Sequence, residues 1–227
     1  LPETVVEIWF MDRSFSGVLD CGKLPKRLSL INLGNNRLTG TLSFAELPAS
    51  VKRFSVARNF LTGTLDLRPA PRSLMYVNVF RNNLHGTITI TRDLELLEGL
   101  HVGGNKFHGN LQLDELPRGL LKLGCDLNDH SGPFDLSVLP RPLKEIRIFT
   151  NGYYGSLHLR DLPREMTHFL VNANSFSGEL SIEDLPDTLQ DIDLRENKFE
   201  GSLALTKLPR DLIEIAVGGN HFSGSAD

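Results

Sequence analysis

The chain has little net charge, few cysteines and no long apolar run, and each shortage excludes a class of protein. Its 227 residues carry a net charge of -4 with both signs interspersed, so no basic surface is available for nucleic acid or an anionic membrane. No run of 18 apolar residues is present to span a bilayer, and the sequence opens in mid-pattern at Leu1-Pro2 and not with a basic-then-apolar segment. We therefore expect no nucleic-acid partner and no membrane insertion, in a soluble chain that is mature or a fragment of a longer protein.

Motifs for catalysis are also missing. The sequence contains no C-x-x-C, no H-E-x-x-H and no Ser/His/Asp or Cys/His set in a pocket-forming context. We expect a protein that is not an enzyme, with no catalytic residue, metal or cofactor.

The most informative feature present in the chain is a sequence repeat of constant length. Ten glycines recur every 23 residues without insertion or deletion, at positions 17, 40, 63, 86, 109, 132, 155, 178, 201 and 224. Alignment from Leu1 gives L-P-x-x-L-x-x-L-x-L-x-x-N-x-F-x-G-x-L-x-L-x-x, as nine full repeats and a partial tenth. A fixed period of this length indicates a solenoid, so residues 1–227 are expected to form a single domain.

Repeat positions 5 to 15 predict a strand and the turn that follows it. Positions 8 and 10 are apolar and alternate with variable residues, as in Ile31 and Leu33, which is typical of a strand with one buried face. Position 13 is asparagine in nine of ten copies, with Arg13 the exception. An inward amide can satisfy backbone groups that the turn hides from water, so the copies should form an asparagine ladder. Position 15, usually Phe or Leu, should form an apolar spine.

The second half of the repeat predicts no α-helix. The glycine at position 17 indicates a corner with positive φ, and the apolar alternation at positions 19 and 21 predicts a second short strand. The Leu-Pro that follows suits a tight corner or a short 3-10 turn. Cys21 and Cys125 fall in apolar positions more than four repeats apart, too far for a disulfide, so both should be free core thiols.

The segment L-x-x-L-x-L-x-x-N-x-F/L resembles the signature of the leucine-rich repeat superfamily, and the remaining G-x-L-x-L-x-x-L-P resembles plant-type and protist arrays. The resemblance implies a mainly β fold, a right-handed and curved solenoid of about ten coils with a concave parallel sheet. Short second strands and 3-10 turns would cover the other faces. It also favours a cell-surface or extracellular location and implies a protein or peptide ligand, or a glycan, on the concave face.

Positions 7, 9 and 11, with 12 and 14 at the rim, are the ones that packing leaves free. Large aromatic and arginine side chains on a rigid sheet have the character of binding hot spots. The residues that we expect to bind a partner on the concave face are Arg53, Arg58, Tyr76, Phe80, Arg81, His101, Arg147, Phe149 and His168.

Two alternatives stay open. Neither end carries a polar cap, so further repeats, caps or subunits should cover the open ends, and the chain could instead be a scaffold that packs through its ends and convex face. Asp126, Asp129 and His130 could in principle gather around a metal, although a polar side chain filling a slot in one repeat is the simpler interpretation. The acidic residues Asp191, Asp193, Glu196 and Glu214 are interpreted as a solvated face.

Overall fold

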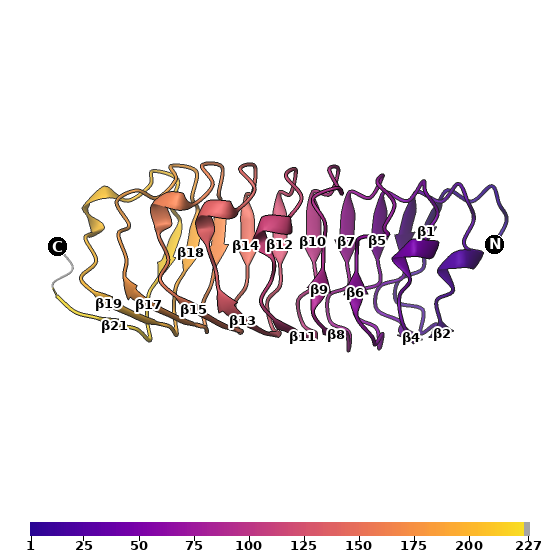
Figure 1. Ribbon diagram of the computed structural model, residues 1–227, viewed down its shortest axis with the longest axis horizontal. Helices are drawn as coiled ribbons and strands as arrows, with labels where there is room; N and C mark the ends of the chain where they lie inside the picture. The colour runs from indigo at the N-terminus through magenta and orange to yellow at the C-terminus, as the bar shows by residue number, and fades with distance from the viewer. Residues whose placement is uncertain (225–227) are drawn as a thin grey trace.

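The backbone is an elongated stack of coils whose termini lie at opposite ends (Figure 1). The computed structural model describes residues 1–224. Each coil has one strand on the long sheet and a second strand elsewhere in the repeat, and the side chains enclosed by the coils form one continuous core. The solenoid contains no α-helix in the described residues, in agreement with the 23-residue period.

A ten-stranded parallel sheet runs the whole length of the molecule. Each residue pairs with the one 23 positions later, as Gly99 pairs with Lys122 and Leu100 with Leu123. Repeat positions 7 and 9 therefore point away from the core, as expected. In order the strands are β1 (Glu7–Trp9), β3 (Leu30–Asn32), β5 (Arg53–Ser55), β7 (Tyr76–Asn78), β10 (Gly99–His101), β12 (Lys122–Gly124), β14 (Glu145–Arg147), β16 (His168–Leu170), β18 (Asp191–Asp193) and β20 (Glu214–Ala216).

The sequence analysis predicted a second strand at repeat positions 19 to 21, but most of the second strands lie earlier in the repeat. Only β6 (Leu65–Asp66) and β9 (Ile88–Thr89) lie near positions 19 and 20. The others pair around the glycine at position 17, because the backbone enters a parallel ladder directly after the asparagine turn. They are β2 (Ser16–Val18), β4 (Arg37–Thr39), β8 (His85–Gly86), β11 (Lys106–Gly109), β13 (Asp129–Pro133), β15 (Gly152–Gly155), β17 (Ser175–Glu179), β19 (Lys198–Gly201) and β21 (His221–Phe222).

Short 3-10 turns precede the Leu-Pro corners instead of following them. In five of the six turns a buried apolar side chain at position 21 opens the turn, and in the sixth the exposed Leu205 does so. The proline carbonyl then accepts a second bond, as from Leu28 N to Pro25 O at 3.1 Å. The turns are η1 (Cys21–Lys23), η2 (Phe44–Glu46), η3 (Leu113–Glu115), η4 (Leu136–Val138), η5 (Leu159–Asp161) and η6 (Leu205–Lys207). No described helix is long or apolar enough to cross a bilayer.

The asparagines form the predicted ladder. The Asn128 side-chain oxygen accepts the N–H of Phe107 in the preceding coil at 3.0 Å, and its amide donates to the carbonyls of Cys125 and Val102 at 3.1 and 3.3 Å. Asn59, Asn82 and Asn197 repeat the pattern. One side chain thus satisfies backbone groups in two coils, which ties neighbouring coils together.

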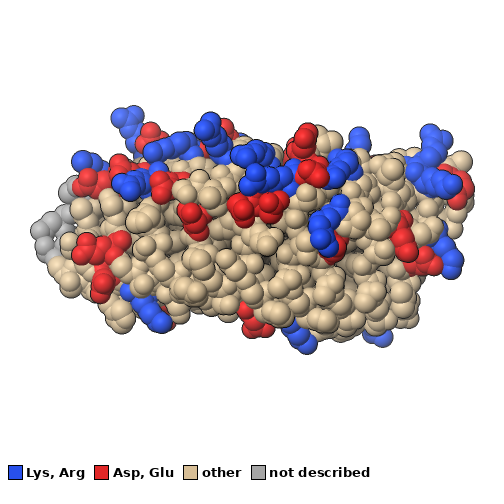
Figure 2. All heavy atoms as spheres, viewed as in Figure 1, with Lys and Arg blue, Asp and Glu red and all other residues tan. Residues whose placement is uncertain are grey.

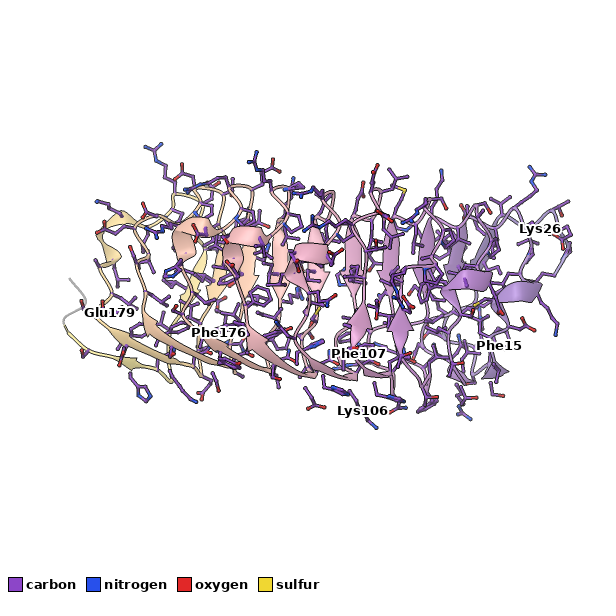
Figure 3. All side chains as sticks on the ribbon, viewed as in Figure 1. Phe15, Lys26, Lys106, Phe107, Phe176 and Glu179 are labelled. Atoms are coloured by element: carbon purple, nitrogen blue, oxygen red, sulfur yellow. The ribbon has the colours of Figure 1, made fainter. Side chains whose placement is uncertain are left out.

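An aromatic stack runs beside the second strands, and Figure 3 shows Phe107 and Phe176 along this edge. Successive rings of Phe107, His130, Tyr153, Phe176, Phe199 and Phe222 stack with centroids 6.0–6.3 Å apart. The His130 and Tyr153 side chains are buried, and neither the His130 Nε2 nor the Tyr153 hydroxyl has a hydrogen-bond partner. Position 130 is therefore a polar side chain in the apolar spine, as the simpler interpretation held.

The glycines at position 17 have the predicted positive φ; Gly155, for example, has φ 95°. In β13 and β17 this glycine nevertheless lies inside the second strand and does not mark a corner. Position 12, directly before the asparagine, is also left-handed, as at Arg81 (φ 54°). The sequence reasoning did not foresee this second left-handed position.

Both cysteines are free and buried, as predicted. Burial raises the pKa of the Cys21 thiol to about 11 and also raises that of Cys125. In the view of Figure 2, charged side chains gather along one long edge, and much of the adjoining surface is uncharged.

Candidate functional site

A hollow of about 760 Å³ opens on the exposed face of the ten-stranded sheet, over β5, β7, β10, β12 and β14. This face is the predicted concave one, and we call it the sheet face. The hollow spans five of the ten strands of this sheet, and glycines lie at outward positions of the repeat there.

Three glycines form the floor of the hollow. A Cβ at Gly99 would lie 2.6 Å from the Tyr76 ring, and one at Gly103 would lie 2.7 Å from the Asp126 carboxylate. Gly124 lies beside them on the next strand, β12. Because glycine has no side chain, these positions leave space on the sheet face. The Tyr76 ring and the Asp126 carboxylate, from adjacent coils, occupy part of that space.

One wall is built from arginines that stack on aromatic rings. The Arg53 guanidinium lies 4.9 Å from the centroid of the Tyr76 ring, and Arg81 lies 5.2 Å from that of Phe80. Asn78 orients this wall, because its side-chain oxygen accepts the Phe80 N–H at 3.0 Å. Stacking keeps the rings in place and leaves guanidinium N–H groups free to bind a ligand.

The opposite wall carries an ion-pair cluster and an aromatic ring. The Glu145 carboxylate binds Lys122 at 3.0 Å and also Arg147. The Glu145 side chain is only 10 % exposed, whereas those of Lys122 and Arg147 are 54 % and 46 % exposed. Burial raises the pKa of Glu145, but hydrogen bonds and the nearby charges of Lys122 and Arg147 outweigh it and lower the pKa. Phe149 completes this wall.

The side chains of His101 and Asp126 both lie over the floor of the hollow. The His101 ring packs against Tyr76 with centroids 5.3 Å apart. Burial lowers the pKa of His101, which favours the neutral imidazole, and burial raises the pKa of Asp126. Asp126 is 6 % exposed and forms no ion pair with any residue in the described range.

The structure brings together seven of the nine predicted binding residues. Arg53, Tyr76, Phe80, Arg81, His101, Arg147 and Phe149 line the hollow. Arg58 and His168 do not line it. His168 lies on β16, beyond the hollow. The His168 Nδ1 instead lies 2.9 Å from the Thr167 hydroxyl.

Sequence reasoning missed the other polar groups of the hollow: Asn78, Glu98, Lys122, Asp126 and Glu145. All but Glu98 occupy positions 7, 9 or 11, and that periodicity could have found them. Asp126 faces the hollow, Asp129 is exposed and His130 is in the core, so these three residues do not converge on a metal. Across residues 1–224, no cluster of three or more His, Cys, Asp or Glu could hold a metal ion.

The lining residues of the hollow include aromatic faces, guanidinium groups and buried carboxylates. Side chains of these kinds are typical of binding sites.

No protein-family model and no curated protein matches the sequence. Solved structures do match the fold. The Arabidopsis receptor kinase HAESA, solved with the peptide hormone IDA and the co-receptor SERK1, superposes with a TM-score of 0.77 at 21% identity, over 96% of this chain and 38% of that one. A plant ice-binding protein superposes with a TM-score of 0.75 at 21% identity, over 97% of this chain and 73% of that one.

YopM from Yersinia enterocolitica WA-314 is also similar, with a TM-score of 0.61 at 25% identity over 88% of this chain and 44% of that one. The chain thus spans less than half the length of the HAESA and YopM chains. The HAESA match includes its leucine-rich repeat ectodomain. Together with the 23-residue parallel coils, these likenesses show that the chain adopts the leucine-rich repeat fold.

Proposed function

We propose that the chain is a non-enzymatic protein-binding module that holds an extended peptide segment of its partner in the hollow on the sheet face. The observation that carries this proposal is the placement of Tyr76 and Phe80 on one side of a glycine floor and Phe149 on the other. Rigid aromatic and arginine side chains give a ligand a large contact area at little entropic cost.

The fold comparison supports the same class of ligand. HAESA was solved with a bound peptide hormone, and another similar structure is the plant peptide hormone receptor RGFR1 in complex with RGF2. By the same analogy we propose a cell-surface or extracellular location. Residues 1–227 would act as one domain of a longer protein.

The test is to select random peptides on the immobilised chain and to titrate the best peptide against variants by calorimetry. We expect Tyr76→Ala and Phe149→Ala to weaken binding by about 1 kcal/mol or more, because each removes a wall of the hollow. Arg164→Ala and Arg210→Ala, which alter exposed arginines away from the hollow, should leave the affinity unchanged. Equal affinity for all four variants would exclude the hollow as the binding site.

The competing function is a scaffold that packs through its ends and convex face. It is favoured by the apolar side chains exposed on the first coil away from the sheet face, among them Phe15 at 48 % and Val18 at 68 %. A complex that buries these residues and leaves Tyr76 and Phe149 in solvent would support the scaffold.

A further inference from the structure

The Asp126 carboxylate is a buried charge without an ionic partner. Arg81 and Arg147 both influence it electrostatically, but neither forms an ion pair with it in the described part of the chain. Its side chain leans back over Gly103, where a Cβ would lie 2.7–2.9 Å from the carboxylate atoms. A carboxylate held this far from water is costly unless a donor reaches it.

A second acceptor converges on the same place. The position that a Cβ would take on Gly124 is 3.1 Å from the His101 Nδ1 and 3.6 Å from the Asp126 Oδ1. No hydrogen bond joins the two side chains, and the neutral imidazole can present a lone pair. The space above Gly124 is therefore bordered by two acceptors and suits a group with several N–H donors.

The charges of the hollow differ in exposure. Asp126 over the floor and Glu145 on the wall are buried, whereas Arg53, Arg81, Glu98, Lys122 and Arg147 are exposed. Glu145 is paired with Lys122 and Arg147. Buried charges are screened less than exposed ones, so the unpaired Asp126 acts most strongly on a group that enters the hollow.

We propose that the space above Gly124 receives the basic side chain of a lysine or arginine on the bound peptide, with Asp126 as its counter-ion and His101 as a second acceptor. Acidic residues of the same peptide then contact Arg53 and Arg81, which stack on rings and have no carboxylate partner in the described structure. This inference rests on the proposed function and adds the charge pattern of the ligand.

The spacing of the coils sets the spacing of that pattern. Arg81 and Asp126 belong to repeats two apart, which places them roughly 10 Å from each other along the stack. Side chains on one face of an extended peptide repeat at roughly 7 Å, so an acidic residue two to four positions from the basic one fits.

The experiment uses a positional-scanning library of hexapeptides, N-acetylated and C-amidated so that the termini carry no charge. One position at a time is lysine, arginine, norleucine or glutamate. Binding is measured for the wild type, Asp126→Asn, Gly124→Ala and the control Asp187→Asn, which makes the same exchange at an exposed aspartate outside the hollow. Thermal unfolding confirms that each variant is folded.

We expect the wild type and Asp187→Asn to prefer lysine or arginine over norleucine at one position by about tenfold, as a charge-assisted hydrogen bond provides. Asp126→Asn should lose this preference and keep the preference for glutamate. Gly124→Ala should lose it as well, because the methyl group fills the space while the charge remains.

Two results would overturn the inference in distinguishable ways. Peptides that bind through Tyr76 and Phe149 but show no preference for a basic residue, or an equal preference in Asp126→Asn, would contradict the counter-ion role and leave the peptide-binding function standing. Failure to retain any peptide above the level of Tyr76→Ala would overturn both.

Discussion

His130 and Tyr153 introduce polar groups into a stack that is otherwise made of phenylalanine. With a proton on Nδ1 donated to the Gly109 carbonyl at 3.3 Å, the His130 Nε2 is left as an unpaired acceptor, and the Tyr153 hydroxyl in the next coil is also unpaired. The His130 and Tyr153 rings stack at the same spacing as the phenylalanines, so their packing is unchanged. Their polar atoms, however, lack hydrogen-bond partners. An unsatisfied buried polar group lowers stability even where packing is good.

Replacing His130 by phenylalanine should therefore stabilise the protein, by about 1 kcal/mol at neutral pH. Burial, only partly offset by the Gly109 carbonyl, lowers the pKa of His130 below its ordinary 6.5. Below pH 6.5 the unfolded chain binds a proton that the folded chain does not, so the wild type loses stability as pH falls. The gain in His130→Phe should be larger at pH 5 than at pH 7, as measured by urea unfolding.

Tyr153→Phe is the matched control, because it removes the other unpaired group without removing a histidine. Its effect should be the same at both pH values. An equal pH dependence in the wild type and in His130→Phe would contradict the assignment of a buried neutral histidine.

At the scale of elements, the glycine at position 17 has a backbone conformation that one repeat predicts and a strand assignment that it does not. The regular spacing correctly predicted a positive φ, since only glycine adopts this conformation without strain. Its place inside β13 and β17 was not predicted. Strand pairing there depends on the next coil, and a single repeat does not contain that information.

Gly155→Val should destabilise the protein by about 1–3 kcal/mol through backbone strain alone. A Cβ at this position would meet no atom within 4 Å, so the Cβ itself adds no clash. Thermal unfolding checks the prediction, with Ser156→Val as the control at an exposed neighbour. Identical melting temperatures for Gly155→Val and the parent would show that φ at this site is not constrained.

For the whole molecule, coils that contact only their neighbours should tolerate the loss of one complete repeat. Deletion of residues 185–207 brings β16 next to β20 in the same register and allows Phe176 to stack on Phe222. We expect the shortened chain to keep its circular dichroism per residue and its peptide affinity, because the hollow lies in earlier coils.

Deletion of residues 185–195 alone is the control, since it places the asparagine and glycine positions out of register and should unfold the C-terminal coils. If both deletions gave the same spectrum, the 23-residue coil would not be the unit of stability.

The sequence by itself determined the period, the inward and outward positions, the asparagine ladder and the two free thiols. Each of these follows from residue type and spacing within one repeat, as Asn128 and Cys125 illustrate. It also identified seven of the residues that line the hollow, because packing leaves positions 7, 9 and 11 variable.

Only the tertiary structure shows that those residues line one hollow and in which direction their side chains point. The Tyr76 ring lies over Gly99 and the Asp126 carboxylate lies over Gly103, because each fills the space that a neighbouring coil leaves empty. Arg58 and His168 have the right residue types but lie outside the hollow. A side chain's direction on this sheet depends on the size of its neighbours 23 residues away, and so it emerges only when the coils are stacked.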